Sequence, residues 1–479
     1  MTVAEADFAH AARPRVTVES FLAPKTIAVV GAAPSAQRSI RGALVRMLKI
    51  GKFSGEILPV NPSYPEVDGW KCYPSVTSIM RPIDLAIIAV PAPAVLDVVR
   101  ECADRGVKSA IIISSGFAEE SEAGAVLQRQ VREVARISGM RICGPNCEGF
   151  HSAANEVAAT FSPTVSVVSR PAHVRIEPAR YSVVAQSGGL GFSIYERGHK
   201  AGVSFNHVVT TGNECDLTTI DFIEHFVDEP CNDGVIAYLE EVRDTARLLD
   251  AAERAHRIGK TIIAIKIGRT EAGRRAARFH TASDTGSIEA ARNLFSTAGI
   301  VEVADADEAI AAALACATNP PISGNRVGIV TTAGGAGTVL SDALGAAGFA
   351  VPELSEALQA SLRPTFPSYG SAANPIDVTA QGIFTGGALK TFKELIDEKA
   401  VDAIVLALSL SNDRAVSINI ETLRKLSDLF GKPVLVHSYT TASVFARDAF
   451  ARAGFVLFEQ VRDVVVGLRA LARMPLATR

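Results

Sequence analysis

Short apolar runs that end in a small or turn-forming residue recur along the whole chain, and they constrain the fold more than any other feature. Examples are TIAVVGAA, DLAIIAVP and SAIIISSGF, and helical patterns such as APAVLDVVRECADRG separate them. Nearly continuous apolar strands that alternate with amphipathic helices are typical of parallel sheets covered on both faces. The sequence therefore predicts an α/β protein built from parallel sheets.

The apolar runs fall into three blocks along the 479 residues. Residues 1–22 are expected to form a mobile tail or a short docking helix, and the first block covers residues 23–151. Residues 152–180 lack clear periodicity and contain three prolines, which predicts a linker. The second block covers residues 181–318 and the third covers residues 319–479, with NPPISGN at their boundary.

The second and third blocks resemble each other. VVAQSGGLGFSIYERGHKAGV in the second block matches GIVTTAGGAGTVLSDALGAAGF in the third, each with a strand, a glycine turn and a helix. Further on, TTGNECDLTTIDFIE and SAANPIDVTAQGIF occupy corresponding places. The pattern predicts two flavodoxin-like domains that arose by duplication.

Charge and composition argue against several classes of protein. A net charge of −3 gives no general attraction to nucleic acids or anionic membranes. No apolar run reaches about eighteen residues, and the start of the chain lacks a signal-peptide pattern, so we expect no membrane segment. Seven cysteines, at spacings unlike those of a disulfide framework or a zinc site, favour a reducing cytoplasm and no metal.

Small residues follow the predicted strands of the first block. Ligands of open parallel sheets bind beyond the carboxyl ends of the strands, where small residues let backbone amides approach closely. The loop that begins at Gly31 also carries two arginines that suit phosphates. Because no tight GxGxxG follows Val30, a nucleotide other than NAD is favoured, and an NAD(P) dehydrogenase stays the alternative.

The motif QSGGLG places Ser187, Gly188 and Gly189 between a strand and a helix of the second block. Backbone amides at the start of a helix carry partial positive charge and suit an anion. The third block repeats the arrangement at Gly334 and Gly335. For either turn, the alternative is tight packing of strand and helix without a ligand.

Of the nine histidines, His280 has the most distinctive surroundings. In RRAARFHTASDTGS, basic residues precede it, and hydroxyl-bearing residues and a glycine follow it. A histidine that accepts phosphate needs a neutral ring, a partner for its second nitrogen and donors for the phosphoryl oxygens. The hydroxyls after His280 and the amides of residues 187–189 are candidate donors, and Glu240 is a candidate partner. No other ligand lies nearby at metal spacing, which disfavours a metal site.

The order of these motifs matches a known family. VVGAAP, PVNPSYPEVDGWKCYPSV, GMRICGPNCEGF, VVAQSGGLG, YLEEVRD and KIGRTEAGRRAARFHT make the chain resemble the α subunits of the nucleoside-diphosphate-forming acyl-CoA synthetases, relatives of succinyl-CoA synthetase. The resemblance spans nearly the whole chain from about residue 23. It implies a CoA-binding Rossmann-like domain, two flavodoxin-like domains, and a reversible reaction of acyl-CoA, phosphate and ADP that gives a carboxylic acid, CoA and ATP through an acyl phosphate and a phosphohistidine.

The resemblance also assigns roles to single residues. His280 matches the phosphohistidine, and Glu240 matches the glutamate that supports it. The phosphoryl-binding turn matches Ser187, Gly188 and Gly189, and the CoA-binding loops match Gly31, Ser39, Asn61, Pro62, Val90 and Pro91. These parts suit phosphoryl transfer, which depends mainly on positioning and charge neutralisation.

The three blocks leave no room for the ATP-grasp module that binds the nucleotide in this family. The resemblance therefore implies a β subunit that binds ATP or ADP with Mg²⁺, in an α2β2 assembly or around an α dimer. Several positions depart from the family pattern: Arg38, Glu148, Glu241, Phe279 and Ala282. They leave open the alternative of a non-catalytic CoA-binding regulator that keeps the fold.

Overall fold

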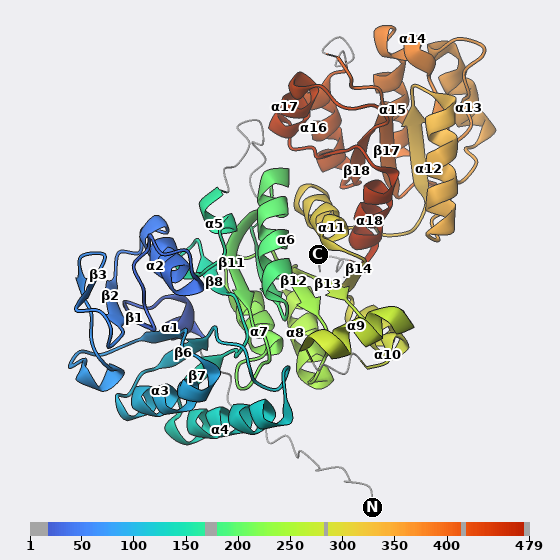
Figure 1. Cartoon of the computed structure of the whole chain (residues 1–479). Helices are drawn as coiled ribbons and strands as arrows, with labels where there is room; N and C mark the ends of the chain where they lie inside the picture. The colour runs from blue at the N-terminus through green and yellow to red at the C-terminus, as the bar shows by residue number, and fades with distance from the viewer. Residues whose placement is uncertain (1–17, 168–179, 282–285, 413–417, 474–479) are drawn as a thin grey trace, which may run out of the picture.

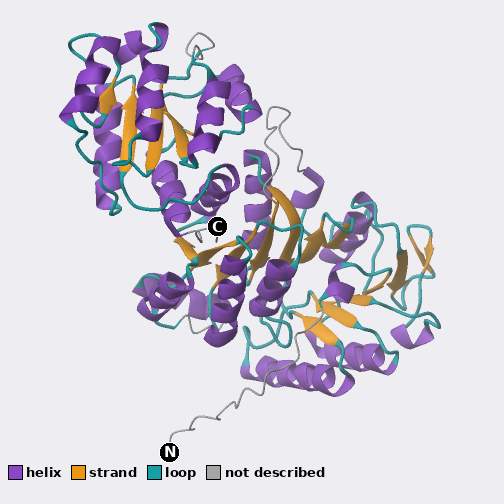
Figure 2. Ribbon diagram, turned by 180° about the vertical axis from the view of Figure 1, so that it is seen from behind, coloured by secondary structure: helices purple, strands orange, loops and turns teal. Residues whose placement is uncertain are grey.

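The computed structural model describes residues 18–167, 180–281, 286–412 and 418–473, without the side chains of residues 167, 278–281 and 383–384. Three α/β domains follow one another along the chain, and each is built around its own sheet (Figure 1). Helices lie over both faces of these sheets, as the view from behind also shows (Figure 2). The α/β class expected from the apolar runs is confirmed.

The first domain has a parallel sheet with the strand order β2-β1-β5-β6-β7. Its strands are β1 (Thr26–Val30), β2 (Glu56–Val60), β5 (Leu85–Ile88), β6 (Ser109–Ile112) and β7 (Arg141–Cys143), beside the small hairpin of β3 (Glu66–Val67) and β4 (Trp70–Lys71). Its helices are α1 (Glu19–Leu22), α2 (Ile40–Ile50), α3 (Ala92–Asp104) and α4 (Glu122–Ser138). Within the expected tail, α1 buries Phe21 and Leu22 in the core, and residues 1–17 lie outside the described residues.

The second domain has the sheet order β14-β13-β12-β10-β11-β8-β9. Its strands are β8 (Gly149–Ser152), β9 (Val157–Thr160), β10 (Arg180–Ala185), β11 (Ser204–Thr210), β12 (Gly234–Leu239), β13 (Thr261–Lys266) and β14 (Val301–Val303). Its helices are α5 (Thr164–Val167), α6 (Gly188–Ala201), α7 (Thr219–Asp228), α8 (Thr245–Arg257), α9 (Glu271–Thr281), α10 (Ile288–Ala298) and α11 (Ala306–Thr318). The parallel part, β10 to β14, has the flavodoxin-like order.

The hairpin of β8 and β9 differs from the expected layout. It straddles the expected end of the first domain and the start of the linker, and β8 pairs antiparallel with β11. All eight residues of its two strands are buried, so neither face shows the polar alternation that marks a strand in a sequence. Of the expected linker, residues 168–179 lie outside the described residues.

The third domain has a parallel sheet with the order β16-β15-β17-β18-β19, which repeats the flavodoxin-like order of β10 to β14. Its strands are β15 (Val327–Thr331), β16 (Ile376–Asp377), β17 (Ala403–Leu408), β18 (Val434–Ser438) and β19 (Leu457–Phe458). Its helices are α12 (Gly334–Ala346), α13 (Glu356–Leu362), α14 (Thr379–Phe384), α15 (Gly387–Asp397), α16 (Ile420–Phe430), α17 (Val444–Arg452) and α18 (Val461–Arg473). The expected pair of flavodoxin-like domains is confirmed.

Helices α11 and α18 pack together where the second and third domains meet (Figure 1). Ala312 of α11 and Val466 of α18 belong to the core of the second domain, whereas Ala315 and Leu468 belong to the core of the third. Each helix therefore serves two cores. Among the described residues, no helix has both the length and the apolar character needed to span a bilayer.

Candidate functional site

Three neighbouring strands of the second sheet end at one edge, and the predicted phosphoryl site lies there. Strand β10 pairs with β12, with Ala185 opposite Tyr238, and β12 pairs with β13, with Leu239 opposite Lys266. The turn before α6 follows β10, Glu240 follows β12, and α9 follows β13. Because parallel strands end at a common edge, the fold brings together segments that are far apart in the sequence.

The turn before α6 exposes the first amides of the helix. Ser187 is the N-cap residue, and among the described residues its side chain makes no capping hydrogen bond. Gly188 is half-buried, and Gly189 is exposed. The first N–H groups of a helix lack intrahelical acceptors and carry partial positive charge. These features suit an anion, and the binding of phosphate at this turn stays a prediction.

Gln186 ties this turn to Glu240, and the sequence did not single it out. Its Oε1 accepts hydrogen bonds from the backbone N–H groups of Glu240 and Glu241, the second at 3.0 Å. Its Nε2 donates to Glu214 Oε2 at 3.1 Å. The side chain is buried, so these bonds are not weakened by competing water. Its place directly before the glycine turn was the available signal.

Glu214 extends the hydrogen-bond network of Gln186. Its Oε1 accepts from Thr211 Oγ1 at 3.0 Å and from the backbone N–H and the hydroxyl of Thr219 at 2.8 and 2.6 Å. Arg243 Nη1 lies 3.9 Å from Glu214 Oε2. Donors therefore compensate a carboxylate that is only 6% exposed, as a buried charge requires.

Glu240 directly follows β12 and is buried, with 4% of its surface exposed. Its carbonyl oxygen accepts a hydrogen bond at 2.7 Å from Nζ of Lys266, the last residue of β13. Nζ also donates to the carbonyl of Ile267 at 2.8 Å. A buried ammonium group thus fixes the main chain of Glu240, and sequence analysis did not detect Lys266 because it reads as one residue of an apolar strand.

His280 lies in the last turn of α9. Its side chain is outside the described residues, as are the side chains of Phe279 and Thr281 and residues 282–285. Ser287, one of the expected phosphate donors, instead caps α10, because its Oγ accepts from the N–H of Ala290 at 3.2 Å. The fold therefore places the helix that carries His280 at the same sheet edge as the turn and Glu240, with His280 at the far end of that helix.

The residues matched to the CoA loops lie at the carboxyl edge of the first sheet, after the adjacent strands β2, β1 and β5. Gly31 has φ +88°, and a Cβ there would lie 2.6 Å from the carbonyl oxygen of Ala89, so this turn requires glycine. Pro62 and Pro91 are exposed on that edge, and Val90 is half-buried.

Two of the matched residues support the loops through internal hydrogen bonds. Ser39 caps α2, because its Oγ accepts from the N–H of Gly42 at 3.1 Å. Asn61 is 8% exposed, and its Nδ2 donates to the carbonyl of Ala32 at 2.8 Å. The Asn61 amide therefore joins the loops after β1 and β2, and both residues shape the edge.

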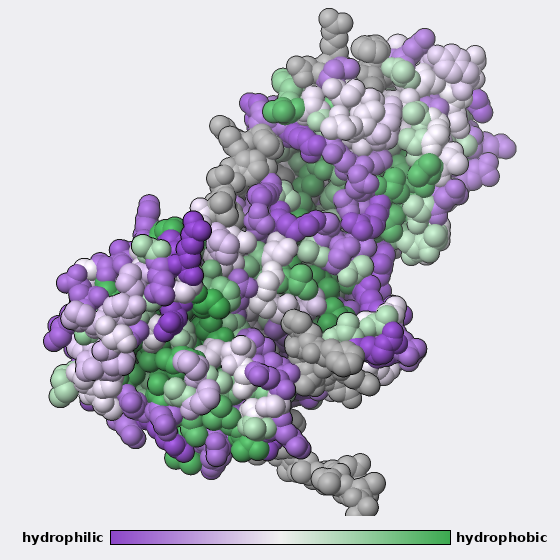
Figure 3. Space-filling view, in the orientation of Figure 1, coloured by the Kyte–Doolittle hydropathy of each residue, from purple (hydrophilic) through white to green (hydrophobic). Residues whose placement is uncertain are grey.

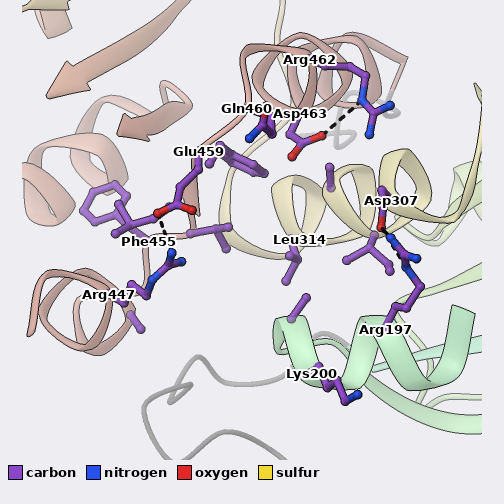
Figure 4. A pocket seen from close by; sticks show the side chains of 17 residues that line it. Arg197, Lys200, Asp307, Leu314, Arg447, Phe455, Glu459, Gln460, Arg462 and Asp463 are labelled. Carbon is purple, nitrogen blue, oxygen red and sulfur yellow. Dashed lines mark hydrogen bonds and ion pairs between the residues drawn. The ribbon is translucent and has the colours of Figure 1, made fainter. Parts of the chain in front are cut away.

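A cavity of about 460 Å³ lies elsewhere, between α6, α11, α17 and α18 (Figure 4). Hydrophobic residues gather in the hollow between the second and third domains on the face drawn in Figure 3. Charged residues that line the cavity pair with one another, as Arg447 does with Glu459 at 2.5 Å and Arg197 with Asp307 at 2.9 Å. The cavity lies toward the C-terminal end of α6, away from the turn, and its arginines already have carboxylate partners.

Three family models match successive parts of the chain. They are the CoA binding domain (residues 25–153), the succinyl-CoA ligase like flavodoxin domain (residues 178–316) and the ligase-CoA domain (residues 327–414). These matches account for most of the three domains described above.

Relatives match over longer stretches. The alpha subunit of ADP-forming acetate–CoA ligase II from Pyrococcus furiosus is 31% identical over 464 residues, or 95% of this chain and 97% of the relative. ADP-forming acetate–CoA ligase I from Archaeoglobus fulgidus is 33% identical over 75% of this chain, which spans only 50% of that relative. A solved structure of acetyl-coenzyme A synthetase 1 from Ca. Korarchaeum cryptofilum, in complex with phosphate and ADP, matches with a TM-score of 0.79 and 28% identity over 95% of this chain and 96% of that one.

Proposed function

The chain belongs to the family of the ADP-forming acetate–CoA ligases, and on that premise we propose that it is the α subunit of an acyl-CoA synthetase. It interconverts acyl-CoA, phosphate and ADP with a small carboxylic acid, CoA and ATP. The names of the relatives support an enzyme over a CoA-binding regulator. The match to a CoA-binding model supports CoA over a nicotinamide nucleotide as the ligand of the first domain.

One observation carries this proposal: the Gln186 amide joins the α6 turn to the main chain of Glu240 at the edge where α9 begins. Phosphate attacks the acyl-CoA thioester, the C–S bond breaks, and acyl phosphate and CoA result. The phosphoryl group then moves from the acyl phosphate to the imidazole of His280, which releases the carboxylic acid. In the last step His280 passes the phosphoryl group to ADP.

The α6 turn holds the phosphoryl oxygens during these steps through the amides of Ser187, Gly188 and Gly189. Fixed amides stabilise a phosphoryl group without having to reorganise as it transfers. Glu240 orients the ring of His280 and favours the tautomer whose other nitrogen is free to attack. CoA binds at the carboxyl edge of the first sheet, over the loops of Gly31, Asn61 and Val90.

An ATP-grasp β subunit completes the enzyme and binds ATP or ADP with Mg²⁺. The P. furiosus relative, of which this chain matches 97%, is named as an alpha subunit, which supports a separate partner subunit. We expect an α2β2 assembly or an α dimer. All seven cysteines are free thiols, which supports a location in the reducing cytoplasm.

Labelling with acetyl [³²P]phosphate tests the proposal on the full chain without its partner. The chain without substitutions is expected to take up the label. The label should be stable in alkali and lost in acid, as expected of a phosphohistidine. His280→Asn is expected to lower labelling to background. His256→Asn, which changes an exposed histidine of α8, is the matched control and should label fully. Full labelling of His280→Asn would show that another residue accepts the phosphoryl group.

The rate of labelling tests Glu240. Glu240→Gln is expected to slow labelling at least about tenfold and to leave the Kd for CoA unchanged, because the first domain binds CoA. Glu241→Gln, at the next residue, is the matched control. Equal rates for the two variants would remove Glu240 from the mechanism.

A further inference from the structure

The carboxyl group of Glu148 lies against the turn to which phosphate is assigned. A Cβ built on Gly188, the first residue of α6, would lie 3.0 Å from Glu148 Oε2 and 2.9 Å from Glu148 Cβ. This chain therefore brings a titratable acid to a place built for anions.

The hydroxyl groups of two threonines hold the main chain of Glu148 from two sides. Its N–H donates to Thr210 Oγ1 at 2.9 Å, at the end of β11. Its carbonyl accepts from Thr160 Oγ1 at 2.7 Å, at the end of β9. These two bonds therefore fix the backbone of Glu148 to the ends of two strands, beside the start of α6.

The groups that face this carboxyl do not neutralise it. Burial raises the pKa of Glu148, and the nearby Ser162 hydroxyl offsets only part of this rise. From α6 it meets the backbone at Gly188, and from β9 and β11 its main chain meets the hydroxyls of Thr160 and Thr210. Among the described residues, no charged side chain contributes to the shift of its pKa.

A phosphate bound at this turn would lie close to the Glu148 carboxylate. The two negative charges would repel each other, because the effective dielectric constant there is low. Proton uptake removes the repulsion and turns the carboxyl into a hydrogen-bond donor. We propose that Glu148 selects the occupancy of the α6 turn, which takes a phosphate or acyl phosphate while the carboxyl is protonated and binds it weakly while the carboxyl is charged. This inference rests on the proposed function, because it needs the turn to be the phosphate site.

A purely structural role makes a different prediction. A carboxylate beside a helix start also stabilises the helix, and Asp377 lies in the same way against Gly334 of α12, with Oδ2 3.0 Å from the Cβ position. If Glu148 served only the helix, Glu148→Gln would lower stability and leave the pH dependence of anion binding unchanged.

Sulfate is the probe for the test, because it mimics phosphate and does not titrate between pH 5.5 and 8.5. Calorimetric titrations on the full chain carry His280→Asn throughout, which removes the imidazole as a second titrating group. In the parent chain, which carries His280→Asn and keeps Glu148, sulfate is expected to bind more weakly as the pH rises and to be accompanied by uptake of up to one proton. Titrations in two buffers of different ionisation enthalpy measure this proton uptake.

Glu148→Gln is expected to bind sulfate at least about tenfold more tightly at pH 8 and to lose the pH dependence. Glu196→Gln removes a carboxylate farther along α6, where it pairs with Lys200, and should behave like the parent. Proton uptake by the parent chain is read without any substitution at Glu148, so a variant that fails to fold does not remove the test.

The results separate the two levels of inference. If the parent binds sulfate without proton uptake, or if Glu148→Gln keeps the parent's pH dependence, the role of Glu148 is wrong and the turn is still an anion site. If neither protein binds sulfate at any pH, the turn is not an anion site, and its part in the proposed function is wrong as well.

Discussion

The turn between β10 and α6 in the second domain and the turn between β15 and α12 in the third occupy the same place in two sheets of the same strand order. They differ in what holds them. In the second domain Gln186 bonds to Glu214 and to the main chain at Glu240. In the third, Thr332 bonds to the hydroxyl of Tyr439 at 2.9 Å.

The strand ends beside the two turns differ in the same direction. Tyr238 pairs with Ala185 and Ala407 pairs with Thr331, so Glu240 and Ser409 are corresponding residues two positions on. The N-cap residues are Ser187 and Ala333. The shared fold thus supplies two helix starts suited to anions. A carboxylate lies against each of them, Glu148 at Gly188 and Asp377 at Gly334, whereas the strand end that carries Glu240 in the second domain carries Ser409 in the third.

The largest expected effect comes from removing the side chain that holds the second-domain turn. Gln186→Leu leaves Glu214 without one donor and the Glu240 and Glu241 amides without their acceptor, which should cost about 2–4 kcal/mol. Thr332→Val loses one bond between hydroxyls and should cost about 1 kcal/mol. Hydrogen exchange read by mass spectrometry separates the two domains. Equal losses would mean that the turns are held equally strongly.

Acid is expected to weaken the second domain through His151, which lies on β8, an addition that the third sheet lacks among its described strands. Burial lowers the pKa of His151 to about 4. Because an unfolded histidine binds its proton near pH 6.5, stability falls as the pH drops from about 6.5 to 4, by about 2–3 kcal/mol at pH 4.5.

His151→Gln should remove this part of the acid sensitivity. Exchange of the amides of β8, β9 and β11, measured at pH 7 and pH 4.5 and corrected for intrinsic rates, is the readout. An unchanged pH dependence in the variant would show that other groups control the acid response of this sheet.

A matched pair of glycines tests what the two domains share. A Cβ at Gly191 would lie 3.0 Å from Ala185 Cβ and from Thr210 Cγ2, and one at Gly337 would lie 2.9 Å from Pro375 Cβ. Gly191→Ala and Gly337→Ala should each cost about 1–2 kcal/mol, because both helices must move off their sheets. Thermal unfolding of the two variants is the measurement, and a large loss in only one would break the symmetry of helix packing.

The smallest expected change in stability is at Ser187. Among the described residues its hydroxyl makes no capping bond, so Ser187→Ala should change the free energy of unfolding by less than about 0.5 kcal/mol. Ser39→Ala, which removes a capping bond from α2, should cost about 1 kcal/mol. If Ser187 donates to the phosphoryl group, labelling by acetyl phosphate falls several-fold although stability does not.

Local patterns predicted much of this architecture. DLAIIAVP contains β5, QSGGLG contains the start of α6, and the repeat in the last two blocks corresponds to two sheets of one strand order. The hairpin of β8 and β9 was missed because both of its faces are buried. The ties at the site were missed for another reason: Gln186 and Glu240 are 54 residues apart, and nothing local in either segment indicates the hydrogen bond between them.

The candidate residues divide along the same line. Gly31 was recognisable because it directly follows an apolar run, and its φ of +88° is a local property of that turn, whereas its close approach to Ala89 is not. The cap that Ser39 makes on α2 is also local, but the bond from Asn61 to Ala32 depends on where another loop ends, as does the contact of Glu148 with Gly188. Sequence thus indicated which loops form the edges, and only the fold shows which side chains support them.

The final helix has a consequence for how the enzyme can move. Because α18 completes two cores at once, the last domain cannot swing as a lever on a hinge without tearing apolar surface from its neighbour. A premature stop shortly before residue 461 would likewise harm the middle of the protein as much as its end.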